Sequence, residues 1–133
     1  MKKLLPIFIT ALLLVGCAAP AEQEVSYRQI TMDEAVAIME EEKNYIILDV
    51  RTVAEFNEKH IPGAINIPNE TIATDTIPEL PDKEQLILVY CRSGNRSKQA
   101  AEKLVKLGYT NFVEFGGIND WTGETETNEG GPL

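Results

Sequence analysis

The order of apolar patterns along the chain is what most limits its possible folds. Between Tyr27 and Phe115, short apolar runs alternate with segments in which apolar residues recur every three or four positions. The runs at residues 45–50 and 86–90 are typical of strands buried on both faces, and the segments between them are typical of amphipathic helices. This alternation predicts an α/β fold with a parallel sheet covered by helices, and it disfavours a sandwich.

Local signals predict where several of these elements begin and end. Thr31 with Glu34, and Thr52 with Glu55, have the spacing of capping boxes that open helices. Gly108 follows an apolar helical face and is expected to end that helix in a left-handed conformation. Strands are expected at residues 27–30, 45–50, 86–90 and 112–115, with a further brief strand just before Pro68.

The first residues of the chain have the pattern of an export signal. Lys2 and Lys3 precede an apolar run at residues 4–15, which is shorter than the roughly 20 residues needed to span a bilayer. Residues 1–16 are therefore predicted to be a signal peptide that is removed from the mature protein.

The segment Leu14-Val15-Gly16-Cys17 is similar to a bacterial lipobox, which predicts that Cys17 is lipidated and becomes the first residue. Such lipidation attaches two acyl chains, which anchor a protein stably. We therefore expect the mature protein on the exported side of a cell-envelope membrane. The alternative is an ordinary secretory signal with an incidental cysteine. The remaining chain is then divided into a lipidated tether at 17–26, a domain at 27–122 and a disordered tail at 123–133.

Charge and cysteine content exclude several classes of function. With 12 basic and 21 acidic residues the formal net charge is −9, which disfavours nucleic acid as a partner. Only Cys17 and Cys91 are present, so lipidation of the first leaves no structural disulfide. One histidine and one remaining cysteine do not make a zinc site of the usual composition, and no metal or cofactor is expected. A lone thiol in an exported protein is thus a candidate functional group.

The cysteine lies in a polar loop between a buried strand and the start of a helix, with the sequence Cys91-Arg92-Ser93-Gly94-Asn95-Arg96-Ser97. Open parallel sheets bind ligands at such places. Free N–H groups at the helix start are expected to surround an anion on the sulfur. Residues 85–101 contain no acid, whereas Arg92, Arg96 and Lys98 all fall there. We therefore expect Cys91 to be an ionised, solvent-open nucleophile; the alternative is an inert buried cysteine.

The reactive loop and three further segments, which follow the expected order along the chain, give the chain its family resemblance. The loop and its preceding strand resemble the active-site segment of rhodanese-like sulfurtransferases. Asp49-Val50-Arg51, Glu55-Phe56 and residues 60–68 are similar to the amino-terminal signature of that family, and Phe115-Gly116-Gly117-Ile118 with Trp121 to its carboxyl-terminal signature. The resemblance extends from about residue 31 to residue 121, with Lys59 at a position where many members have glycine.

This resemblance implies a three-layer fold with a central, parallel, five-stranded sheet flanked by helices. It also implies that Cys91 accepts a sulfane sulfur from thiosulfate or a persulfide donor, and passes it to a thiophilic acceptor such as a thiol or cyanide. The substrate-binding residues would be Arg92, Ser93, Gly94, Asn95, Arg96 and Ser97. Supporting ion pairs are expected among Asp49, Arg51 and Glu55, and His60 is interpreted as a structural imidazole.

Two other functions remain open at this stage. Phosphatases and arsenate reductases use a loop with five residues between cysteine and arginine, whereas four separate Cys91 from Arg96 here, and Ser97 stands where that arginine would be. A shorter loop is expected to close around one sulfur more tightly than around phosphate. A non-catalytic module that carries sulfur or binds a protein partner also remains open, because a sulfur carrier needs the same cysteine as a catalyst, and the sequence identifies no such partner.

Overall fold

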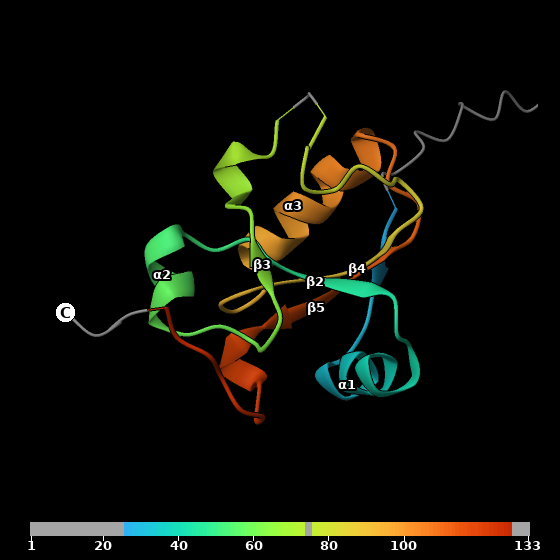
Figure 1. Ribbon diagram of the computed structural model, residues 1–133. Coiled ribbons are helices and arrows are strands. Elements are labelled where there is room, and N and C mark those ends of the chain that lie inside the picture. Colours follow the sequence, from blue (N-terminus) through green and yellow to red (C-terminus); the bar gives the residue numbers. More distant parts are fainter. Residues whose placement is uncertain (1–25, 74–75, 129–133) are drawn as a thin grey trace, which may run out of the picture.

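The computed structural model describes residues 26–73 and 76–128 (Figure 1). The predicted signal peptide, the lipidation site Cys17 and most of the predicted tether lie outside the described residues. Within the described part, every helix is too short or too polar to cross a bilayer.

A five-stranded parallel sheet forms the centre of the fold, as the alternation of patterns predicts. Its strands are β1 (Arg28–Gln29), β2 (Tyr45–Asp49), β3 (Ile65–Asn66), β4 (Leu86–Cys91) and β5 (Phe112–Gly117). Their order across the sheet is β1-β5-β4-β2-β3, and all neighbours are parallel. The central strand β4 is apolar on both faces because helices cover both sides of it.

Helices on opposite faces of the sheet bury two apolar clusters, which makes the fold three-layered (Figure 1). The helices are α1 (Met32–Glu41), α2 (Val53–Glu58) and α3 (Asn95–Lys106), with single 3₁₀ turns at η1 (Asn69–Thr71) and η2 (Ile118–Asp120). In one cluster, Ala100 and Leu104 of α3 pack with Val89 of β4. In the other, Ala35 of α1 packs with Leu88 and Phe115. The fold class inferred from the sequence is confirmed.

The predicted helix signals are present, one of them in part. Thr52 and Glu55 form the complete capping box at the start of α2. At α1, the Thr31 side chain accepts the Glu34 amide at 3.1 Å, which is the first of the two bonds of such a box. Gly108, with φ 91°, adopts the left-handed conformation expected after α3.

The prediction of a disordered tail is wrong as far as Asn128. His60 and Glu126 exchange two antiparallel backbone hydrogen bonds, each 2.9 Å long, and the Asn128 amide donates to the carbonyl of Asn57 at 2.9 Å. The Trp121 side chain packs against an apolar cluster of the domain, and its indole donates to the carbonyl of Glu124 at 2.9 Å. Main-chain pairing holds this segment, and a search for apolar side-chain periodicity does not detect such pairing.

Candidate functional site

Cys91 ends β4 with its sulfur enclosed by the loop that follows. The Gly94 amide donates to Sγ at 3.0 Å, and the thiol donates to the Ser97 hydroxyl at 3.4 Å. Gly94 has φ 116°, a left-handed conformation that glycine adopts without strain, and it precedes the first turn of α3. The loop therefore turns back over the sulfur and aims the start of a helix at it.

The sulfur is buried, in contrast to the prediction that it is open to solvent. Cys91 is 1% exposed and contacts the apolar cluster beneath α3. The expected ring of amides consists, in the described part of the chain, of the single N–H of Gly94. Burial follows from the short loop, since its main chain and Ser97 occupy the space above the sulfur. The thiol nevertheless has polar partners on both sides, unlike a cysteine packed only among aliphatic groups.

Arg96 of the loop and Glu55 of α2 form a bidentate ion pair. The guanidinium donates to the two carboxylate oxygens at 2.6 and 3.0 Å. Hydrogen bonds from Arg96 are the main reason that the pKa of Glu55 falls to about 2. Glu55 was expected to join Asp49 and Arg51 in one ion-pair network, but its ion pair is with Arg96, because the capping box at α2 turns its carboxylate towards α3.

Asp49 and Arg51 form a separate, buried pair at the end of the neighbouring strand β2. The Arg51 Nη2 lies 2.6 Å from the Asp49 carboxylate, and the two residues are 3% and 0% exposed. The Arg51 amide also donates to Asp49 at 2.9 Å, and its guanidinium donates to the Lys59 carbonyl at 2.7 Å. All these bonds are internal to the scaffold, in agreement with the supporting role expected for this pair.

The exposed rim of the loop consists of Arg92, Ser93 and Asn95. Within the described residues Arg92 forms no ion pair, and the residue is exposed. Its carbonyl accepts the Asn119 amide at 3.1 Å. A side chain at Gly117 would collide with that same carbonyl, which explains why β5 carries glycine where it passes the loop.

Ser97 and Glu114 meet behind the sulfur, a contact that the sequence did not reveal. Ser97 is 0% exposed and Glu114 is 3% exposed, and the hydroxyl donates to Glu114 Oε1 at 2.6 Å. The Gly116 amide donates to the same oxygen at 2.8 Å. Ser97 was expected to bind substrate, and the structure places it beside Sγ inside the protein. The one available signal was an acid within the otherwise apolar run at residues 112–115.

A bulge in β5 explains how this carboxylate reaches the loop. Val89 pairs with Glu114 but Cys91 pairs with Gly117, so β5 contains one more residue than β4 between the two pairs. Gly116, with φ 89°, supplies the left-handed residue of the bulge. The bulge brings Glu114 and Gly117 to opposite ends of the same loop.

His60 lies away from the sulfur and supports the end of α2. It is 4% exposed, its ring stacks on Phe56 with the centroids 3.8 Å apart, and Nδ1 is 2.8 Å from the Phe56 carbonyl. Its Nε2 lies 3.5 Å from the carboxylate of Glu126. Every one of these contacts is within the scaffold, as a structural imidazole requires.

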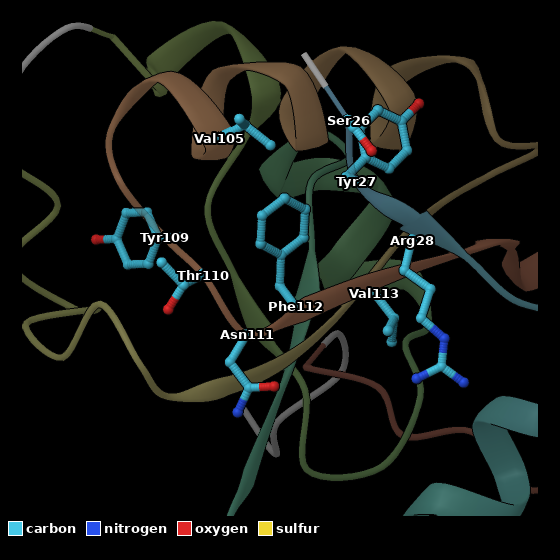
Figure 2. Close-up of a pocket in the computed structure, with 9 residues that line it drawn as sticks. All are labelled: Ser26, Tyr27, Arg28, Val105, Tyr109, Thr110, Asn111, Phe112 and Val113. Atoms are coloured by element: carbon cyan, nitrogen blue, oxygen red, sulfur yellow. The ribbon is translucent and has the colours of Figure 1, made fainter. Parts of the chain in front are cut away.

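In the described part of the chain, one cavity lies at the far edge of the sheet and another lies beside the loop. A cavity of about 520 Å³ lies between β1, the end of α3 and the start of β5 (Figure 2), and none of the predicted site residues lines it. A cavity of about 370 Å³ is bordered by Gly94, Lys98, Glu114 and Asp120. We therefore place the functional site at the loop, where the polar buried groups gather.

A parallel sheet whose carboxyl edge presents a cysteine loop, closed by the first turn of a helix, defines a class of α/β proteins with a sulfur nucleophile at the usual ligand-binding edge. The family described as Rhodanese-like domain matches residues 31–124. The chain therefore belongs to the rhodanese-like family, and its relatives include sulfurtransferases.

Two relatives illustrate the range of names in this family. The thiosulfate sulfurtransferase PspE of Escherichia coli (strain K12) is 38% identical over 73 residues, which cover 55% of this chain and 70% of that protein. The putative sulfur carrier protein YrkF of Bacillus subtilis (strain 168) is 31% identical over 107 residues. That match covers 80% of this chain and 57% of YrkF, so the chain spans little more than half of this relative.

Solved structures have the same fold. A rhodanese-like domain protein from Staphylococcus aureus has a TM-score of 0.64 at 32% identity, covering 76% of this chain and 98% of that one. A rhodanese with anions from E. coli has a TM-score of 0.57 at 34% identity, covering 62% of this chain and 98% of that one.

Proposed function

We propose that the protein is a sulfurtransferase that moves a sulfane sulfur from thiosulfate, or from a persulfide donor, to a thiophilic acceptor. The observation that carries this proposal is the sulfur of Cys91, held against the Gly94 amide in a closed loop at the start of α3. Such a setting favours a negatively charged sulfur because the amide and the helix start both present positive charge to it. The relative named as a thiosulfate sulfurtransferase supports the choice of substrate.

The reaction has two steps that balance without a cofactor. The Cys91 thiolate attacks the sulfane sulfur of thiosulfate, the S–S bond of thiosulfate breaks, and sulfite leaves with the electron pair. Cyanide or a thiolate then attacks the outer sulfur of the persulfide and regenerates the Cys91 thiolate. The loop amide holds the charge on sulfur in a fixed position, which is electrostatic preorganisation. Arg92 attracts the anionic donor, and Arg96, already paired with Glu55, orients the loop.

Formation of thiocyanate from thiosulfate and cyanide tests this proposal. We expect the full chain to form thiocyanate and Cys91→Ser to form none. Cys17→Ser is the matched control because it replaces the other cysteine of the chain, and it is expected to keep the activity in the same assay.

A sulfur carrier is the second candidate, and the relative named as a putative sulfur carrier favours it. If the unaltered chain and Cys91→Ser are equally inactive while Cys91 still reacts with iodoacetamide, the carrier or partner-binding function replaces the enzyme. Hydrolysis of an aryl phosphate that disappears in Cys91→Ala would favour a phosphatase instead.

We also propose that the mature protein is a lipoprotein, anchored through Cys17 on the exported side of a membrane. The lipobox-like segment that ends in Cys17 supports this location. Cell fractionation is expected to find the protein with membranes and Cys17→Ala in the soluble fraction. An unaltered distribution of the variant would contradict the anchor and leave the proposed chemistry untouched.

A further inference from the structure

Three groups form a continuous hydrogen-bonded chain from the reactive sulfur to a cavity. The Cys91 thiol donates to the Ser97 Oγ at 3.4 Å, and that hydroxyl donates to Glu114 Oε1 at 2.6 Å. All three residues are at least nine-tenths buried. Of the three, Glu114 borders the cavity of about 370 Å³ beside α1. Glu114 therefore lies between the closed interior of the loop and a space in which water can exchange protons.

We propose that Ser97 and Glu114 form a proton relay that takes the proton from Cys91 when its sulfur becomes anionic. The S–H bond breaks as its proton passes to Ser97 Oγ, while the former hydroxyl proton of Ser97 passes to Glu114. The products are a thiolate that accepts a hydrogen bond from Ser97, and a neutral carboxyl group that donates to the serine. Atoms and charge balance, and no further reactant is needed. The inference deepens the proposed function, because it assigns the proton of the nucleophile.

The geometry of the hydrogen bond between Ser97 and Glu114 favours proton transfer over a purely structural role for Glu114. An O–H···O⁻ distance of 2.6 Å is in the range of strong, charge-assisted hydrogen bonds. A fixed carboxylate close to a thiolate would also repel it. The Ser97 hydroxyl also lies 3.0 Å from the Gly94 carbonyl and 3.3 Å from the Gly116 carbonyl, but among these acceptors only the Glu114 carboxylate, the nearest, can take up a proton. The bulge in β5 places the acid here.

Other charges around the relay come from each neighbouring element. On α3, Arg96 interacts with the charge of Cys91 but is paired with Glu55, and Lys98 lines the cavity. Asp120 of η2 lines the same cavity. Before β1, burial and then the charge of Glu114 raise the pKa of Tyr27. In the part of the chain that the structure describes, none of these charged groups forms a hydrogen bond with Ser97, whereas Glu114 does, so we assign the proton transfer to Glu114.

The relay makes a specific prediction about pH. In the relay Glu114 accepts the thiol proton through Ser97 as the sulfur attacks, so this route exchanges no proton with bulk water and its rate constant does not depend on bulk pH. The rate constant for alkylation of Cys91 is therefore expected to be level between about pH 6 and about pH 8. In Glu114→Gln the proton has to leave to water, so the same rate constant should rise by about tenfold per pH unit. At about pH 6 the variant should be slower by at least about tenfold.

The experiment measures alkylation of the full chain by iodoacetamide, quantified on the peptide that contains Cys91 so that Cys17 does not contribute. Glu114→Gln keeps an oxygen that can accept from Ser97, and Ser97→Ala tests the same path if the first variant does not fold. Both are expected to give the sloping profile, and Ser97→Thr, which restores a hydroxyl, to give the level one. Asp120→Asn removes a carboxylate from the same cavity wall and should behave as the unaltered chain.

Parallel profiles for all these proteins would overturn the relay. So would a Glu114→Gln variant that reacts faster at every pH, because the carboxylate would then act only by repelling the thiolate. The measurement requires no sulfur donor. A chain that lacks sulfur transfer but has the level profile would therefore contradict the proposed function alone.

Discussion

The ends of β2 and β4 lie side by side at the same edge of the sheet, with Asp49 next to Tyr90. The polar side chains at these two strand ends nevertheless have different hydrogen-bond partners. At β2, the Asp49 carboxylate is satisfied by the amide and guanidinium of Arg51, two residues away. At β4, the Cys91 sulfur has one amide and one hydroxyl, and that hydroxyl belongs to a chain of contacts ending at Glu114. At β2 the charge is neutralised locally by a neighbour in the sequence, whereas at β4 the buried sulfur is linked by hydrogen bonds to a residue that borders a cavity.

The largest expected effect on stability comes from removing the ion pair between Asp49 and Arg51 at the end of β2. Asp49→Asn leaves Arg51 buried without an anionic partner, and loss of one member of such a pair costs about 3–5 kcal/mol. Urea unfolding should show this loss, while the alkylation rate of Cys91 in the folded variant stays within about twofold of the original. Glu102→Gln, an exposed acid on α3, is the control and should cost less than about 0.5 kcal/mol. A cost below about 1 kcal/mol for Asp49→Asn would remove the contrast between the two strand ends.

A second prediction concerns the close approach of β5 to the loop. Gly117→Ala is expected to displace the Arg92 carbonyl, with a loss of about 2–3 kcal/mol and slower thiocyanate formation. Gly108→Ala is the matched control, because it has space around it but a left-handed φ of 91°. It should cost about 1–2 kcal/mol and leave the reaction of the folded protein unaltered. Equal activity in both variants would show that the position of the loop does not depend on β5.

Loss of the ion pair between Glu55 and Arg96 is expected to have a smaller, pH-dependent effect on stability. Glu55→Gln can keep the cap of α2 and removes the ion pair with Arg96, so we expect a loss of about 1–2 kcal/mol at neutral pH. The pKa of Glu55 is about 2 in the folded protein against an ordinary value of 4.5. A lowered pKa stabilises the fold above the ordinary value, and this contribution disappears as the pH falls from 4.5 to about 2.

Thermal unfolding of both proteins along this pH range is the measurement. The difference in Tm between the unaltered chain and Glu55→Gln should shrink steadily as the pH falls. A difference that is constant with pH would show that the variant disturbs packing, and that the ion pair contributes little.

The smallest expected effect is at the start of α2, which belongs to the β2 side of the comparison. Thr52→Ala removes the side chain that accepts the Glu55 amide at 3.2 Å, at a cost of about 1 kcal/mol or less. Thr52→Ser should recover most of the stability in the same urea titration. Alkylation of Cys91 should be unaffected, and a marked change in its rate would mean that the cap of α2 and the reactive loop are coupled.

Features built from residues close in sequence could be predicted, and those that depend on distant contacts could not. The apolar run of β4, the capping box of Thr52 and the paired Asp49 and Arg51 all arise from neighbouring residues. The partner of Glu55 is 41 positions away, and the contact of Ser97 with Glu114 spans 17 positions and depends on the bulge in β5. No local sequence pattern predicts contacts between residues so far apart in the chain.

Burial of the sulfur was mispredicted for a related reason. A polar loop with two arginines indicates an exposed surface, and Arg92 is indeed exposed. The main chain of that loop folds inward at Gly94, however, and closes over Cys91. Residue types predicted that the side chains of the loop are polar, whereas the path of its backbone determined how much of the sulfur reaches solvent.

The most direct test of the proposed sulfur transfer is the mass of the Cys91 peptide after the full chain is incubated with thiosulfate. We expect the peptide to gain the mass of one sulfur atom and to lose it again when cyanide is added. A peptide that stays unmodified by thiosulfate, although iodoacetamide alkylates the same thiol, would contradict the proposal that Cys91 accepts sulfur from this donor.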